Sequence, residues 1–346
     1  MRSTRPSRLL AVGLAAALAL AACSSSDAGD DTEADDGAAA ADDGAFPATI
    51  EHAFGETEID AAPERVVTWG WGSADAAIAL GVVPVAIPFD DYAGDDEGVL
   101  PWIREALDES GDELPEVLPN AEEPPFEAIA AAAPDVILAA YSGITDEEYE
   151  LLSAIAPTVA YPDEAWATPW RDLIEIVGTS LGRADEADDL LAGIDDELAA
   201  QAEAHPELAG KSVAMVWDTP DAFYVYKPAD PRVGFSLALG LQSAESVDEL
   251  STDESTFYFT LSYEQLDQLT SDILVSYADT PEASERFVTS DHGRLMDQVQ
   301  AGAVAEVVGT DFIASVSPPT ALSLTWGLDE YVALLSEAAE TVDAEG

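Results

Sequence analysis

Two tryptophans separated by one glycine, Trp69 and Trp71, end the β-rich run that begins at Arg65. Ligands of open α/β sheets bind outside the carboxyl ends of the strands, where this pair lies. Gly70 lets the backbone approach its neighbours closely, and the two rings cannot both point into one core layer. Because indole rings bury large apolar faces at low entropic cost, the pair predicts a pocket for an amphipathic small molecule. Core packing is the competing interpretation.

A second group combines aromatic rings with two of the few bases. Lys227 and Arg232 follow the aromatic strand Ala222–Tyr226. Arginine can donate two parallel hydrogen bonds to ligand oxygen atoms, and lysine can bind them as a point charge. Salt bridges to Asp221 or Asp230 are the alternative role. The predicted ligand-binding residues are Trp69, Trp71, Tyr92, Tyr141, Arg171, Trp217, Tyr224, Tyr226, Lys227 and Arg232.

Metal ligation and catalysis have no comparable signature. The three histidines, His52, His205 and His292, are not at helical i, i+4 spacing and join no carboxylate motif. No nucleophile elbow, glycine-rich phosphate loop or calcium loop occurs. We therefore predict no metal site, no catalytic residues and no cofactor. An enzyme stays open as an alternative, because acid–base pairs leave no local signature.

Acidic residues dominate the charge of the chain. Its 346 residues include 70 Asp and Glu against 12 Lys and Arg, a formal net charge of −58. Nucleic-acid binding and attachment to anionic lipid headgroups both need a basic surface, so both are excluded as predictions. Because 48% of the residues are hydrophobic, the acidity is expected on the surface of a globular protein.

The first 45 residues are typical of an exported lipoprotein. Arg2, Arg5 and Arg8 precede the apolar run Leu9–Ala22, which has the length of a signal-peptide core and ends in Leu-Ala-Ala-Cys. We therefore predict a signal peptide over 1–22, lipidation of Cys23 and an acidic disordered tether over 23–45. Later residues contain no apolar stretch of membrane-spanning length, so the lipid is the only expected membrane attachment.

The remaining chain alternates predicted strands with helices. This alternation covers residues 63–161. Runs such as Asp135–Ala140 are apolar almost throughout, which is typical of strands covered on both faces. Residues 165–208 show only helical spacing, and the alternation then resumes. The fold class is therefore α/β with mainly parallel sheets.

Several runs together resemble a known family. They are PERVVTWGWGSADAAIALGVVPVAIP, PDVIL, ATPW, FYVYKPADPR and SPPTALSLTWGLD, in this order. They resemble the ferric-siderophore-binding lipoproteins of bacterial ABC importers, in particular an actinobacterial branch. The resemblance implies an α/β lobe over 46–165, a long rigid hinge helix over 166–183, a second α/β lobe over 184–346, and a ligand cleft between the lobes.

The resemblance also implies partners. These are a ferric siderophore and an ABC permease in the cell membrane, for a monomeric protein on the extracytoplasmic face. Asp75, on the first predicted helix, is at the position implied for docking on the permease; no partner acid in the second lobe is assigned. A haem- or cobalamin-binding relative, a surface enzyme and an adhesion lipoprotein remain the alternatives. The scarcity of bases favours a hydroxamate ligand.

Overall fold

The structure of the protein is a computed structural model that describes residues 44–252 and 254–345. The predicted signal peptide, the lipidated Cys23 and nearly all of the tether lie outside the described residues. Within the described part of the chain, no helix is both long enough and apolar enough to cross a membrane.

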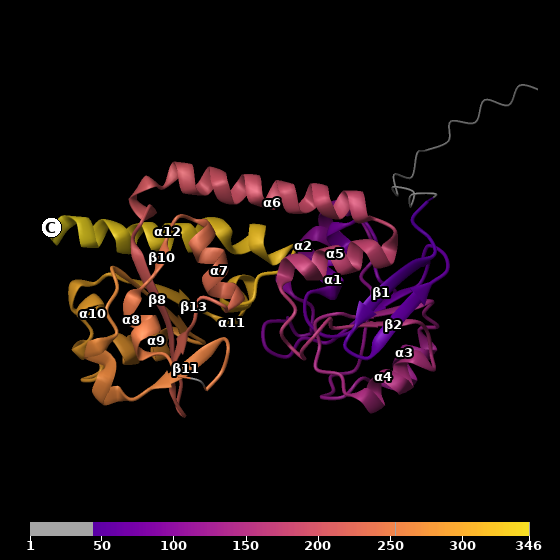
Figure 1. The fold of residues 1–346 in the computed structure, drawn as a ribbon, viewed down its shortest axis with the longest axis horizontal. Coiled ribbons are helices and arrows are strands. Elements are labelled where there is room, and N and C mark those ends of the chain that lie inside the picture. Colours follow the sequence, from indigo (N-terminus) through magenta and orange to yellow (C-terminus); the bar gives the residue numbers. More distant parts are fainter. Residues whose placement is uncertain (1–43, 253, 346) are drawn as a thin grey trace, which may run out of the picture. The chain divides into compact units, whose positions relative to one another are not determined.

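The first lobe is built on a five-stranded parallel sheet (Figure 1). Its strands, in the order β5-β4-β3-β6-β7, are β5 (Glu116–Val117), β4 (Ala86–Ile87), β3 (Val66–Thr68), β6 (Val136–Ala139) and β7 (Thr158–Ala160). All four residues of β6 are buried, as expected for a strand covered on both faces. An antiparallel pair, β1 (Ala48–His52) and β2 (Gly55–Ile59), precedes the sheet.

Five helices accompany this sheet. They are α1 (Ser73–Ala79), α2 (Pro101–Ser110), α3 (Phe126–Ala131), α4 (Asp146–Ser153) and α5 (Trp170–Leu181). Thr145 caps α4 through a capping box with Glu148, which lies in the acidic first turn of the helix.

The second lobe is built on a mixed sheet in the order β11-β9-β8-β12-β13, with β10 beside β8. The strands are β8 (Ser212–Asp218), β9 (Phe223–Tyr226), β10 (Gln242–Ser243), β11 (Tyr258–Leu261), β12 (Ile273–Ala278) and β13 (Val304–Val308). β8, β10, β12 and β13 are parallel, whereas β9 is antiparallel to both β8 and β11. The connection from β8 to β9 is too short for the crossover that parallel strands need, so the two form a hairpin.

The helices of the second lobe complete the α/β pattern. They are α7 (Pro231–Ala238), α8 (Glu245–Leu250), α9 (Pro281–Thr289), α10 (Asp297–Ala301), α11 (Thr310–Val316) and α12 (Ser323–Glu345), with short 3-10 turns at Pro206–Leu208, Tyr263–Gln268 and Gly293–Leu295. The α/β fold class with two mainly parallel sheets is confirmed.

Two helices lie between the sheets in the sequence. The segment 166–183 is predicted as the hinge, and its helical part is α5. This helix packs against α1 and β1 of the first lobe. Gly182 ends α5 in a left-handed conformation, and the 21-residue α6 (Ala184–Ala204) begins two residues later. α6 contacts α5 and also α7 of the second lobe (Figure 1). The longer of the two helices is α6, which lies within the range 184–346 that the resemblance implies for the second lobe.

A second connection runs from the end of the chain to the first lobe. The segment between α11 and α12, residues 317–322, is called the return segment here. Trp71 donates from Nε1 to the carbonyl oxygen of Pro318 at 3.2 Å, and the Thr320 hydroxyl donates to Asp75. The next helix continues this contact, because Trp326 donates from Nε1 to Glu105 of α2 at 3.1 Å.

Candidate functional site

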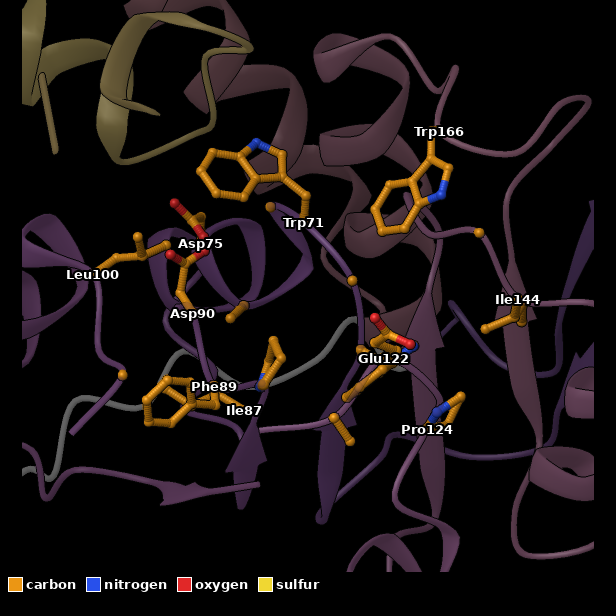
Figure 2. Close-up of a pocket in the computed structure, with 18 of the residues that line it drawn as sticks. Trp71, Asp75, Ile87, Phe89, Asp90, Leu100, Glu122, Pro124, Ile144 and Trp166 are labelled. Atoms are coloured by element: carbon orange, nitrogen blue, oxygen red, sulfur yellow. The ribbon is translucent and has the colours of Figure 1, made fainter. Parts of the chain in front are cut away.

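A cavity of about 350 Å³ lies in the first lobe, beyond the carboxyl ends of β3, β4, β5 and β6. This is the edge at which ligands bind open α/β sheets. Its walls are aromatic and aliphatic with a few acids (Figure 2). The residues that line it include Trp69, Gly70, Trp71, Asp75, Phe89, Asp90, Glu122, Gly143, Glu148 and Trp166.

The Trp69–Gly70–Trp71 turn is held against the end of β6. Trp69 donates from its backbone N–H to the carbonyl of Leu138, and Trp71 to that of Tyr141, both at 2.9 Å. Gly70 has φ +86°, and a Cβ placed there would lie 2.3 Å from the Tyr141 oxygen, so only glycine fits. Both predicted tryptophans therefore line the cavity from one fixed turn.

Trp166 forms another aromatic wall, and the predicted set of ligand-binding residues omits it. Its side chain is 56% exposed, and its ring packs edge-on against Tyr141 with centroids 6.0 Å apart. The indole lies against Gly143, where an added Cβ would be 2.1 Å from Nε1. Figure 2 shows Trp71 and Trp166 on one side of the cavity with open space below them. A lone tryptophan in a loop carries no spacing pattern, which explains the omission.

Asp75 is buried, so the prediction that it docks on a permease is wrong. Its side chain is 1% exposed on α1 and accepts hydrogen bonds from Trp102 Nε1 at 2.6 Å and from the Thr320 hydroxyl. Burial raises the pKa of Asp75, although both donors oppose the rise. A carboxyl enclosed in this way joins the first lobe to the return segment and cannot reach another protein.

Arg232 is a half-buried cation of the second lobe. It lies at the start of α7 and donates from Nε to Asp230 at 2.7 Å, while its guanidinium carbon lies 3.9 Å from the centroid of the Tyr226 ring. Burial opposes the charged form, yet the neighbouring Asp230 keeps the pKa of Arg232 above its ordinary value. The bond to Asp230 uses Nε, and the Tyr226 hydroxyl interacts with the same guanidinium.

Tyrosines of the first lobe lie within electrostatic range of this arginine. Tyr92, in a first-lobe loop, donates its hydroxyl to Asp279 of the second lobe at 2.9 Å. Burial raises the pKa of Tyr141 to about 12 and the pKa of Tyr226 to about 12, so both hydroxyls are neutral donors at physiological pH. The charges of Asp230 and Arg232 also act on the pKa of Tyr141, in opposite directions.

The other two predicted aromatics of the second lobe lie opposite each other on paired strands. Trp217 on β8 is the register partner of Tyr224 on β9. The Trp217 ring packs on Tyr277 with centroids 6.0 Å apart, and the Tyr224 ring packs on Tyr258 at 5.4 Å. Both side chains are half-buried, so each leaves part of its ring for a ligand.

Two of the predicted bases have structural partners within the fold, and their contact with a ligand stays a prediction. Lys227 donates from Nζ to the carbonyls of Thr252 at 2.6 Å and Ser255 at 2.7 Å, which anchors the loop before β11. Arg171 pairs with Asp195 of α6, and its guanidinium carbon lies 4.3 Å from the Trp170 ring centroid. Arg232 is thus the one member of the predicted basic set that lies among the aromatics of the site.

The histidines lie apart and have polar partners of their own. His52 bonds Thr57 at 2.9 Å, His205 lies 2.9 Å from Glu207, and His292 is 3.4 Å from Asp218. Over residues 44–252 and 254–345, no three or more His, Cys, Asp or Glu side chains come together as a metal site would require.

Comparisons with known proteins agree with this architecture. The family model described as "Periplasmic binding protein" matches residues 66–307. The probable siderophore-binding lipoprotein YfiY of Bacillus subtilis (strain 168) is 28% identical over 295 residues, which cover 81% of this chain and 82% of the relative.

Solved structures give the same assignment. PiaA of Streptococcus pneumoniae, crystallised with ferrichrome, superposes with a TM-score of 0.76 at 36% identity, covering 85% of this chain and 99% of PiaA. A periplasmic solute binding protein of Mycobacterium smegmatis superposes with a TM-score of 0.72 at 26% identity, over 84% of this chain and 98% of that one. The chain therefore belongs to the periplasmic binding protein family.

Proposed function

We propose that this protein captures a ferric siderophore outside the cytoplasm and delivers it to the permease of an ABC importer. The observation that carries the proposal is the pairing of a tryptophan-walled cavity in one lobe with the half-buried Arg232 in the other. The names of the similar proteins support it, since YfiY is described as siderophore-binding and PiaA was crystallised with ferrichrome.

The two parts of the site suit the two parts of such a ligand. A ferric siderophore surrounds its iron with oxygen atoms and carries apolar or polar arms outside them. The terminal nitrogens of Arg232 can donate to those oxygens, with the neutral hydroxyls of Tyr226 and Tyr141 as further donors. Trp69, Trp71 and Trp166 can bury the arms. This function requires binding and release without covalent chemistry, and no cofactor of the protein's own.

The arrangement of the chain follows from this role. We place a signal peptide over 1–22, a lipid on Cys23 and a tether up to residue 45, and take the mature protein to be a monomer held at the extracytoplasmic face of the membrane by its lipid alone. The lobes are the two sheets with their helices, and α6 is the element that joins them. Cys23→Ala is expected to release the protein from the membrane fraction of its host without changing ligand affinity.

The binding test uses the intrinsic fluorescence of the site tryptophans. Titration of the protein with a ferric trihydroxamate is expected to quench tryptophan emission in a saturable way with one ligand per protein. The iron-free siderophore and a ferric citrate solution serve as controls for inner-filter effects and for loose iron. Trp71→Ala should weaken binding on the order of 10-fold, corresponding to about 1–3 kcal/mol for one large buried apolar contact. No saturable quenching by trihydroxamate, catecholate or carboxylate complexes would refute the proposed function.

A further inference from the structure

The cavity of the first lobe carries acids and no bases. Among its described lining residues are Asp75, Asp90, Glu122 and Glu148, and none of the lining residues is Lys, Arg or His. Three of the acids have partners within the fold, whereas the role of the fourth is not explained by the fold.

The partners of the first three acids are structural. Asp75 is bound by Trp102 and Thr320, as described above. Asp90 Oδ1 accepts from the backbone N–H groups of its own loop, at 3.1 Å from Tyr92 and 2.7 Å from Ala93. Glu148 accepts from the backbone N–H and the hydroxyl of Thr145 in the capping box of α4, at 2.6 and 2.8 Å.

Glu122 differs from these acids. It lies in the loop between β5 and α3, its side chain is exposed, and no hydrogen bond or ion pair joins it to another described residue. Figure 2 shows its carboxylate directed into the space below the rings of Trp71 and Trp166. A carboxylate facing two indoles is a combination that suits a cation, because indole faces attract cations as carboxylates do.

The second lobe contributes the opposite charge to the site. Arg232, the cation of the site, belongs to the second lobe and is not among the residues that line the cavity. A bound complex would therefore meet a cation on one side and a carboxylate with aromatic walls on the other. The oxygen atoms around the iron suit Arg232, and a positively charged arm suits the cavity.

We infer that the cavity selects ferric siderophores whose arm ends in a protonated amine. This inference rests on the proposed function. Glu122 pairs with the ammonium group while Trp71 and Trp166 enclose its methylene chain. Neutral complexes of the same size lack this contact, so they bind more weakly. The net charge of −58 also attracts any cation at long range, but that attraction is shared by the whole surface and is screened within about 8 Å at physiological salt.

The test compares two ligands that differ only at the amine. Ferrioxamine B carries a protonated primary amine on a neutral ferric trihydroxamate, and its N-acetyl derivative carries a neutral amide there. Dissociation constants are measured by tryptophan quenching for the unaltered protein, for Glu122→Gln and for Glu123→Gln. Glu123 is the matched control, because it is the adjacent exposed acid, loses the same charge, and does not line the cavity.

The expected result is a discrimination of about tenfold in favour of ferrioxamine B, the scale of one partly desolvated cation contact. Glu122→Gln should reduce this ratio to about twofold to threefold by weakening only the binding of ferrioxamine B. Glu123→Gln should keep the full ratio. The discrimination should persist at 0.5 M salt in the unaltered protein, because the contact is local.

The outcomes separate this inference from the proposed function. Equal and tight binding of both ligands would overturn the inference and leave siderophore capture standing. Equal loss of the ratio in Glu122→Gln and Glu123→Gln would also overturn it, because the preference would then belong to the general surface field. Failure of both ligands, together with neutral cyclic trihydroxamates and other ferric complexes, would instead refute the proposed function.

Discussion

Replacing Asp75 with alanine removes the acceptor at the centre of a buried junction. The carboxylate receives hydrogen bonds from Trp102 of α2, at 2.6 Å, and from Thr320 of the return segment, 245 residues away in the chain. Trp102 and Thr320 are 2% and 1% exposed, so both donors lose their acceptor in a buried site. The variant should therefore be less stable and should loosen the return segment from the first lobe.

The size of the effect follows from three contributions. Each buried donor left without a partner costs about 1–3 kcal/mol. Removing the carboxylate recovers part of the free energy spent on burying it, which is the cause of its raised pKa. We expect a net loss of about 2–4 kcal/mol for Asp75→Ala. Asp75→Asn keeps one acceptor and removes the charge, so it should change the free energy of unfolding by less than about 1 kcal/mol.

The assay is urea unfolding of the unaltered protein, Asp75→Ala, Asp75→Asn and Asp96→Ala. Asp96 is an exposed acid of the same lobe, and its replacement should stay within about 0.5 kcal/mol. Amide hydrogen exchange of residues 317–326 should accelerate in Asp75→Ala only. Unchanged stability and unchanged exchange in that variant would show that the carboxylate does not hold the return segment.

Three further outcomes are expected. Arg232→Met should weaken ferric trihydroxamate binding about 10- to 100-fold in the quenching titration, since a charged hydrogen-bond donor is worth about 1.5–3 kcal/mol, and unaltered affinity would remove it from the site. Lys227→Met should leave that affinity within about twofold while lowering the thermal midpoint, because its nitrogen anchors the loop at Thr252 and Ser255; a weakened affinity at full stability would contradict this assignment. The folded state raises the pKa of Asp75 and so holds its proton more tightly than the unfolded chain. Relative to Asp75→Asn, the stability of the unaltered protein should therefore fall as pH rises from about 4 through the folded-state pKa, and urea titrations that find a rise would contradict it.

The sequence predicts the parts of the site that depend on neighbouring residues. The Trp69–Gly70–Trp71 turn could be placed at the edge of the sheet because β3 directly precedes it and Gly70 permits its tight approach to Tyr141. The alternation of strands and helices likewise predicts two α/β sheets. Whether Trp69 and Trp71 contact the ligand stays a prediction.

The parts that the sequence does not predict depend on distant partners. From the sequence Asp75 is a surface acid of a helix, and only its contacts with Trp102 and Thr320 show that it is enclosed. In the sequence, Lys227 and Arg232 are two bases beside the same aromatic strand, and nothing there distinguishes their roles. In the structure, Lys227 donates to backbone carbonyl groups, whereas Arg232 packs on the ring of Tyr226. Glu122 could not be chosen from a chain with 70 acids, because its role depends on which way one loop faces.

The return segment has a consequence for the order in which the protein can mature. A chain made from its N-terminus completes the strands of the first sheet long before residues 317–326 exist. Until then Trp71 in the turn before α1, Asp75 of α1 and Glu105 of α2 have no partner from the end of the chain. A chain that stops after α11 would therefore leave Trp71 and Asp75 of the cavity lining, and Glu105 of α2, without these partners. The effect of such a truncation should therefore be detected at Trp69 and Trp71, although the missing residues lie near the C-terminal end of the sequence.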